Sequence, residues 1–171
     1  MRIYLPSTLD ELDATSTATT TATRVVIPPD GPGGAVGSFG PRIVHAVTSA
    51  LRVALPDEDE EGLEFAALLA AADDALLRVA ARPDAPRLRL VLSLDVAEAD
   101  LTAVDDDDQA PSAALLRVAV GRDVVVCAHV DEPAASADVE RAVAGDAGAA
   151  ERLDDVDLLW YDATELSAIP R

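Results

Sequence analysis

The two histidines of the chain are the residues whose type and placement could carry chemistry. His45 and His129 each lie near the end of a predicted strand, just before a predicted helix begins. Ligand sites gather at the carboxyl ends of strands in α/β sheets. If these two strands are neighbours, His45, His129 and Asp131 could converge as metal ligands or as an acid–base set. The alternative, which the sequence favours, is two unrelated histidines, because no residue nearby supplies a nucleophile or a further ligand.

Other residues that could take part in chemistry give weaker signals. Cys127 is the single cysteine, which excludes an internal disulfide, and its valine-rich surroundings predict a buried, inert thiol. The run Asp105–Asp108 lacks the alternating spacing of a calcium loop and reads as a solvated loop. A carboxylate-bridged metal pair requires a histidine three residues after a glutamate, and none follows Glu60, Glu61 or Glu64 at that spacing. We therefore expect no catalytic residue, no metal site and no cofactor.

The charge of the chain is strongly one-sided. The formal net charge is −19, and every basic side chain is an arginine, because lysine is absent. The absence of lysine excludes a Schiff base and a P-loop lysine. An acidic chain repels nucleic acid and attracts basic partners. A compositional bias from GC-rich codons, or a surface suited to high salt, explains the same charge without a function.

Aromatic residues make up only 3% of the chain, so each one is informative. Trp160 and Tyr161 are adjacent on the last predicted strand and must point to opposite faces. One should join the core, and the other should cover a sheet edge or form a contact surface. Tyr4 occupies a similar place near the start, since 4–12 and 161–169 both run from a strand into a short helix. The candidate binding surface therefore comprises Tyr4, His45, His129, Asp131, Trp160 and Tyr161.

A long helix over 58–82 is the most clearly marked element. Asp57 and Glu60 form a capping box, acidic residues fill the first turn, and Pro83 ends the helix. Apolar residues recur at spacings of three and four, so the predicted core-facing stripe is Phe65, Leu69, Ala72, Leu76 and Val79.

The remaining elements predict a sheet. Short helices are expected over 8–13 and 50–55, a second main helix over 133–143, and a hairpin turn at 121–123. The expected strands are 2–5, 43–47, 87–96, 115–120, 124–130 and 157–161. Their order predicts an α/β (α+β) two-layer sandwich, with a mixed sheet of about four to six strands and helices 58–82 and 133–143 on one face. A ferredoxin-like β-α-β-β-α-β order is one way to arrange it.

The length of 171 residues suits one domain, 1–171. Within it, 14–41 is Thr-rich and then Pro- and Gly-rich, which predicts a flexible insertion that holds at most a short extended piece at 24–27. Its glycines do not form a dinucleotide-binding motif, because position 36 is Val.

Six motifs together resemble a known family. They are MRIYLPSTLDEL, VHAVTSALR, EEGLEFAALLAAADDALLRVA, VLSLDVAEADL, VCAHVDE and LLWYDATEL, in this order along the chain. They resemble an uncharacterised family of small actinobacterial proteins, a domain of unknown function, over nearly the whole chain except 14–41. The resemblance implies a bacterial cytoplasmic setting and supports codon bias as the source of the composition. It implies no activity, cofactor or site residue.

Two functions from different classes follow. The first is a non-enzymatic cytoplasmic module that binds a protein partner, associates with itself or acts in regulation. The alternative is a small metal-binding domain or enzyme that uses His45, His129 and Asp131. No apolar stretch is long enough for a signal peptide or a membrane span, so we expect a cytoplasmic protein with no nucleic-acid or membrane partner.

Overall fold

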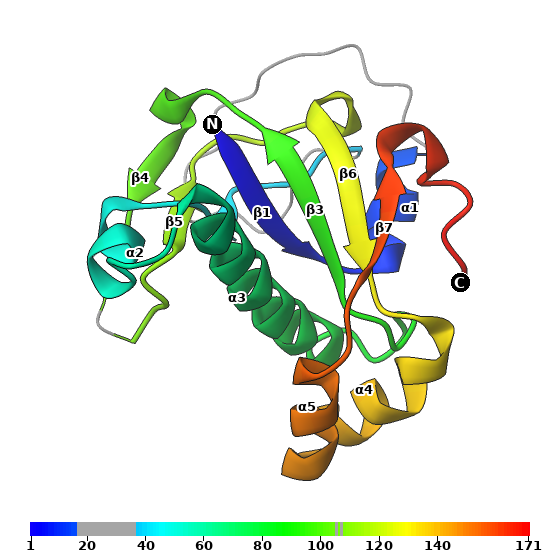
Figure 1. The fold of residues 1–171 in the computed structure, drawn as a ribbon. Coiled ribbons are helices and arrows are strands. Elements are labelled where there is room, and N and C mark those ends of the chain that lie inside the picture. Colours follow the sequence, from blue (N-terminus) through cyan, green and yellow to red (C-terminus); the bar gives the residue numbers. More distant parts are fainter. Residues whose placement is uncertain (17–36, 105, 107) are drawn as a thin grey trace.

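A computed structural model describes residues 1–16, 37–104, 106 and 108–171, and within them the chain forms one seven-stranded antiparallel sheet (Figure 1). The strand order is β4-β5-β2-β1-β3-β6-β7, so β4 and β7 are the edge strands. The strands are β1 (Arg2–Ser7), β2 (Arg42–His45), β3 (Leu90–Asp95), β4 (Leu101–Ala103), β5 (Ala113–Leu116), β6 (Val125–Val130) and β7 (Leu159–Asp162).

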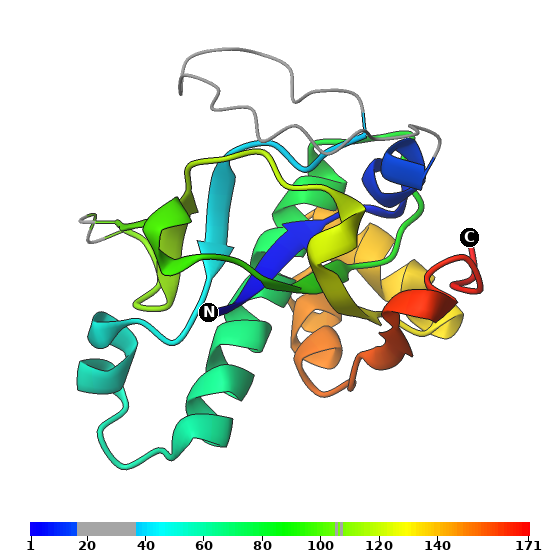
Figure 2. The same cartoon turned by 90° about the horizontal axis from the view of Figure 1, so that it is seen from above.

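Helices cover both faces of this sheet (Figures 1 and 2). They are α1 (Leu9–Ser16), α2 (Ser49–Ala54), α3 (Glu60–Ala80), α4 (Ser136–Val143) and α5 (Ala147–Asp154). The short 3₁₀ helix Ala163–Glu165 follows β7. None of the helices in the described ranges is long and apolar enough to cross a membrane.

The main core lies on the face of the sheet that α1 covers. Strand residues alternate between faces, so Leu90, Leu92 and Leu94 point to this side, and all three are fully buried. Leu9 and Leu12 of α1 and the C-terminal Leu166 and Ile169 close this core. The two ends of the chain therefore pack together on one side of the sheet.

The opposite face carries α3, which packs on β1, β2 and β3. Tyr4 and Val91 point toward this helix. The helix buries a stripe made largely of alanine: Leu63, Ala67, Ala71, Ala72, Ala75 and Val79. Alanine side chains are short, so the helix can approach the sheet closely. The predicted stripe is partly wrong. Ala72 and Val79 are buried as predicted, but Phe65 is exposed, Leu69 is 44% exposed and Leu76 is only partly buried, so the helix is rotated relative to the prediction.

This rotation determines how much the free energy of unfolding should fall when a leucine of α3 is replaced by alanine. Leu63→Ala should lower the free energy of unfolding by roughly 2–5 kcal/mol, because it empties a buried site. Leu69→Ala should cost less than about 1 kcal/mol, because its side chain is half exposed. Urea denaturation of both variants measures the two values. A larger loss for Leu69→Ala than for Leu63→Ala would show that the helix is rotated as the sequence first suggested.

The α+β class is confirmed, but several details of the predicted architecture are wrong. The sheet is wholly antiparallel rather than mixed, and it has more strands than expected. A ferredoxin-like order would place another strand between β1 and β3, whereas these two pair directly. The residues 121–123 do not form a hairpin turn, because β5 and β6 lie far apart in the sheet and a 3₁₀ helix at Arg122–Val124 separates them. β4 and α5 were not predicted.

The stretch 14–41, predicted to be an insertion, is described only at its two ends. At its start, Thr15 is buried within α1. At its end, Phe39 is 1% exposed and exchanges two backbone hydrogen bonds with Val120. These ends belong to the packed structure, so any insertion is shorter than 14–41. The short extended piece expected at 24–27 lies outside the described residues.

Candidate binding pocket

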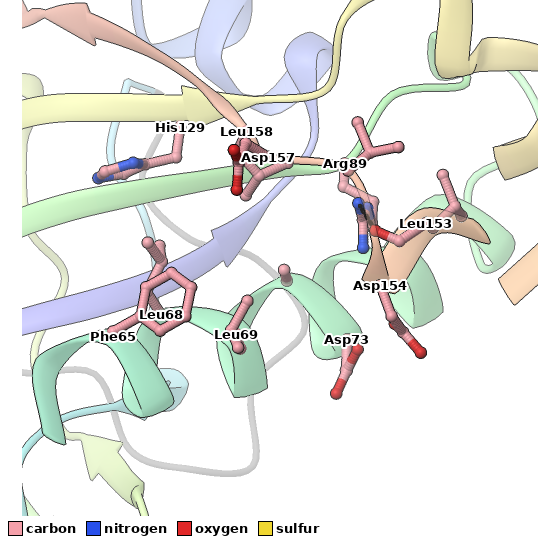
Figure 3. A pocket seen from close by; sticks show the side chains of 12 residues that line it. Phe65, Leu68, Leu69, Asp73, Arg89, His129, Leu153, Asp154, Asp157 and Leu158 are labelled. Carbon is pink, nitrogen blue, oxygen red and sulfur yellow. Dashed lines mark hydrogen bonds between the residues drawn. The ribbon is translucent and has the colours of Figure 1, made fainter. Parts of the chain in front are cut away.

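A pocket of about 500 Å³ opens between α3, the end of β6, α5 and the segment that leads into β7 (Figure 3). The walls combine apolar side chains with a few charged ones, a mixture typical of ligand sites. Twelve residues line it: Phe65, Leu68, Leu69, Ala72, Asp73, Arg89, His129, Leu153, Asp154, Val156, Asp157 and Leu158.

The two ends of the pocket differ in chemistry. Phe65 and Leu68 of α3 lie at one end with His129 of β6, and Asp73 and Asp154 lie at the other (Figure 3). Phe65 is 54% exposed, although a phenylalanine is a costly residue to leave in water. The helix presents its larger side chains to the pocket and its alanines to the sheet.

Trp160 extends this apolar surface along the sheet. It is 59% exposed on the edge strand β7 and pairs in register with His129, so both side chains lie on the same face. Seven large apolar side chains are exposed in the described ranges, and four of them lie in or beside the pocket: Phe65, Leu69, Val156 and Trp160. Singly scattered exposed apolar residues are normal on a protein surface, whereas a gathered group of them is a feature of candidate interaction sites.

His129 forms the polar part of the floor. Its Nε2 atom lies 3.1 Å from Ser93 Oγ and 3.6 Å from Cys127 Sγ, and both partners come from the sheet. Burial lowers the pKa of His129, and the positive charge of Arg2 lowers it further. The imidazole is therefore mainly neutral at pH 7, and this end of the pocket carries no positive charge.

The opposite end carries negative charge that the chain compensates only in part. Burial raises the pKa of Asp73, and the nearby Asp154 carboxylate adds to this rise. Arg89 lies in the same wall and offsets part of the rise in the pKa of Asp73, but its ion pair is with the buried Asp131. Nη2 of Arg89 lies 2.9 Å from Oδ1 of Asp131, and the Arg89 backbone N–H donates to Oδ2 over 2.7 Å. A ligand therefore meets the aspartates rather than the arginine.

His45 and His129 do not meet, so the two histidines are unrelated, as the sequence favoured, and the alternative in which they converge with Asp131 is wrong. His45 lies on β2, and β1 and β3 separate it from β6, so about 14 Å lies between the two histidines at ordinary strand spacing. The ring of His45 is instead hydrogen-bonded to Ser112 Oγ at 2.8 Å and to Asp74 Oδ2 at 3.1 Å. In the part of the chain that the structure describes, no group of three or more His, Cys, Asp or Glu could hold a metal ion.

The other predicted surface residues fall in different places. Tyr4 is buried beneath α3, and burial together with the Glu64 carboxylate raises its pKa to about 12. Tyr161 is half-buried and packs against the main core, on the face opposite Trp160. Of the six residues proposed from the sequence, the pocket region therefore unites His129 with Trp160.

The acidic and apolar walls of the pocket were not predicted. Phe65 and Leu69 fit an amphipathic stripe so well that they were assigned to the core. The aspartates at 73, 154 and 157 are three among many in an acidic chain. One signal in the sequence was available: the alanine positions 67, 71 and 75 recur every four residues and form an alternative buried stripe.

The buried position of Cys127 supports the prediction that its thiol reacts slowly with thiol reagents. Its side chain is only 5% exposed, although it lies beside His129. We expect native protein to react with a thiol reagent at least tenfold more slowly than protein unfolded in guanidinium, because the thiol is shielded. Absorbance of the released chromophore measures both rates. Equal rates in the native and unfolded protein would show that Cys127 is open to solvent.

Comparison with known proteins adds a family but no activity. A family model described as a family of unknown function (DUF6912) matches residues 1–169. The chain therefore belongs to this family. No curated protein and no solved structure matches it.

Proposed function

For this member of a family of unknown function, we propose a role as a non-enzymatic module that binds a segment of a partner protein in the pocket beside α3. The observation that carries this proposal is the gathering of exposed Phe65, Leu69, Val156 and Trp160 around one hollow. Aromatic and aliphatic anchors of this kind dominate the centres of protein interfaces.

The dimensions and polarity of the pocket suit side chains of a partner. A volume of about 500 Å³ has room for a few side chains. The walls offer Phe65, Leu68 and Leu158 as apolar contacts, and His129 offers a polar one. A segment that inserts an apolar side chain here would remove exposed carbon from water on both partners, which favours association.

The surroundings of His129 favour binding over catalysis. Its hydrogen-bond partners among the described residues are Ser93 and Cys127, and no carboxylate there orients the ring. A histidine that activates a hydroxyl or thiol is usually held by a third group, which fixes its tautomer. The pocket therefore supports recognition, with His129 as a neutral hydrogen-bonding group.

The charge of the chain favours a basic partner over a second copy. Two chains that each carry a net charge of −19 repel one another, whereas a basic partner is attracted. The same charge argues against a nucleic-acid partner. A cytoplasmic setting is part of this proposal and is compatible with the single free cysteine.

Titration calorimetry with a purified partner tests this function. The partner is first isolated from an extract of the source organism on the immobilised full-length protein, and then produced separately. We expect Phe65→Ala and Trp160→Ala each to weaken its binding at least tenfold, as at an interface centre. Leu77→Ala is the matched control, because Leu77 lies on the same helix and is exposed but does not line the pocket.

Two results would contradict the proposal. One is a partner that binds the two pocket variants as tightly as it binds the unaltered protein. The other is a small molecule that copurifies at one equivalent and is lost in Phe65→Ala, since the pocket would then serve a metabolite.

A further inference from the structure

We propose that the partner segment carries an arginine whose guanidinium group lies at the acidic end of the pocket, and an apolar side chain at the Phe65 end. This inference rests on the proposed function and names the chemistry of the partner. It follows from the two-ended arrangement of the walls (Figure 3).

The acidic end is assembled from two separate elements. Asp73 comes from α3 and Asp154 is the last residue of α5, whereas Asp157, in the segment before β7, lies over the middle of the pocket beside Leu158 (Figure 3). In the described ranges, neither Asp73 nor Asp154 forms an ion pair with an arginine of the chain. The C-terminal end of α5 adds the negative end of a helix dipole. A cation from outside would therefore relieve repulsion that the chain leaves in place.

The wall between the two ends suits the stem of a long side chain. Leu69 and Ala72 of α3 lie between Phe65 and Asp73 along the helix, and Leu158 and Val156 face the same hollow. The methylene groups of an arginine can cover such a surface while its charged head remains among carboxylates. The partner's apolar residue then packs at Phe65, where Phe65 and Leu68 supply apolar contacts.

An arginine fits this end better than a lysine does. A guanidinium is planar and has five N–H donors, so it can bond to carboxylates from several directions at once. It is also less strongly hydrated than an ammonium group, which lowers the cost of entering a partly apolar pocket. Asp73 and Asp154 supply acceptors from two different helices, which a single ammonium group would use less fully.

Short synthetic peptides test this inference on the full chain. The probes are acetylated, amidated peptides with one leucine and one arginine separated by zero to three glycines, and matched peptides with lysine or citrulline in place of arginine. Trp160 is the only tryptophan, and it lies beside the pocket, so its fluorescence reports binding. Citrulline keeps the shape of arginine without its charge.

We expect the best arginine peptide to bind at least tenfold more tightly than its citrulline match and at least threefold more tightly than its lysine match. Asp73→Asn and Asp154→Asn should each reduce the preference for arginine over citrulline at least threefold. Glu98→Gln is the control, because Glu98 is exposed near the opposite edge of the sheet. Added salt should weaken the arginine peptide more than the citrulline peptide.

Equal binding of the three peptide types would overturn the inference, and so would an absence of arginine-peptide binding at millimolar concentration. A preference for arginine that survives both Asp73→Asn and Asp154→Asn would overturn it as well. These failures are distinct from failure of the proposed function. A purified partner that depends on Phe65 but needs no arginine would leave the function standing and remove only the inference.

Discussion

Asp131→Ala should lower the free energy of unfolding by about 3–5 kcal/mol, the expected cost of leaving a buried charge without its partner. Asp131 is 1% exposed and Arg89 is 4% exposed. Both carboxylate oxygens accept hydrogen bonds from Arg89, one of them also from its backbone N–H. Removal of Asp131 leaves a buried guanidinium without the carboxylate that compensates its charge.

The same substitution should also loosen one wall of the pocket. Nη2 of Arg89 donates to the carbonyl of Leu153 over 2.9 Å and so ties the last turn of α5 to the start of β3. We expect faster amide hydrogen exchange at 150–155 in Asp131→Ala under conditions where the protein remains folded.

The exposed pair Arg2–Asp95 provides the matched control. Its side chains are joined at 2.9 Å but lie largely in solvent. Asp95→Ala should therefore cost less than about 1 kcal/mol in the same urea titration. If both aspartate variants lost the same small amount, the Arg89–Asp131 pair would not be the buried anchor that the structure shows.

Glu11→Ala should produce the second large loss, roughly 2–4 kcal/mol, because Glu11 joins three elements through a partly buried ion-pair network. It lies on α1 and accepts from Arg42 of β2 over 3.0 Å and from Arg78 of α3 over 2.5 Å. Ser7 Oγ donates to it as well. The network joins α1 to α3 at one end of the sheet, although the two helices cover opposite faces of that sheet. Urea denaturation at pH 7 measures the loss.

The contribution of Glu11 should depend on pH in a defined direction. Burial tends to raise the pKa of Glu11, but Arg42 and Arg78 outweigh this effect and hold the pKa below its ordinary value. A lowered pKa in the folded state means that the carboxylate stabilises the fold above about pH 4.3, the value in unfolded chains. This stabilisation is lost as the pH falls through the folded-state value.

Glu11→Gln tests this dependence because it keeps the size of the side chain and removes its charge. The difference in unfolding free energy between Glu11→Gln and the unaltered protein should be largest near pH 7 and should shrink below about pH 4. A difference that stays constant from pH 7 to pH 3 would show that Glu11 acts through packing alone.

Local patterns were sufficient to predict most of the individual helices and strands. The alternation Leu88–Leu94 placed a strand with one apolar face, and the structure buries Leu90, Leu92 and Leu94 on one side. The alternation of side chains along a strand also correctly predicted that Trp160 and Tyr161 lie on opposite faces of the sheet. These predictions succeeded because they depend on neighbours in sequence.

Features that depend on tertiary pairing were not predictable in this way. The sequence gives no sign that β3 would pair directly with β1, which excludes the ferredoxin-like order. Asp131 was a candidate ligand because Arg89, its partner, is 42 residues away along the chain. Phe65 and Leu69 were assigned to the core because hydropathy cannot distinguish a stripe packed on a sheet from one that lines a pocket. Alanine packing against the sheet decided the rotation of α3.

Site-specific photocrosslinking tests the central claim, that the pocket binds a partner protein, most directly. A photoreactive benzophenone amino acid is placed at position 69 in one variant and at position 77 in another, and each full-length protein is irradiated in cells of the source organism. Both positions lie on α3 and are exposed, but only position 69 lines the pocket. We predict that position 69 crosslinks to one partner protein, through one segment identified by mass spectrometry, and that position 77 does not. The same partner crosslinked equally well from both positions, or no partner from position 69, would contradict the claim.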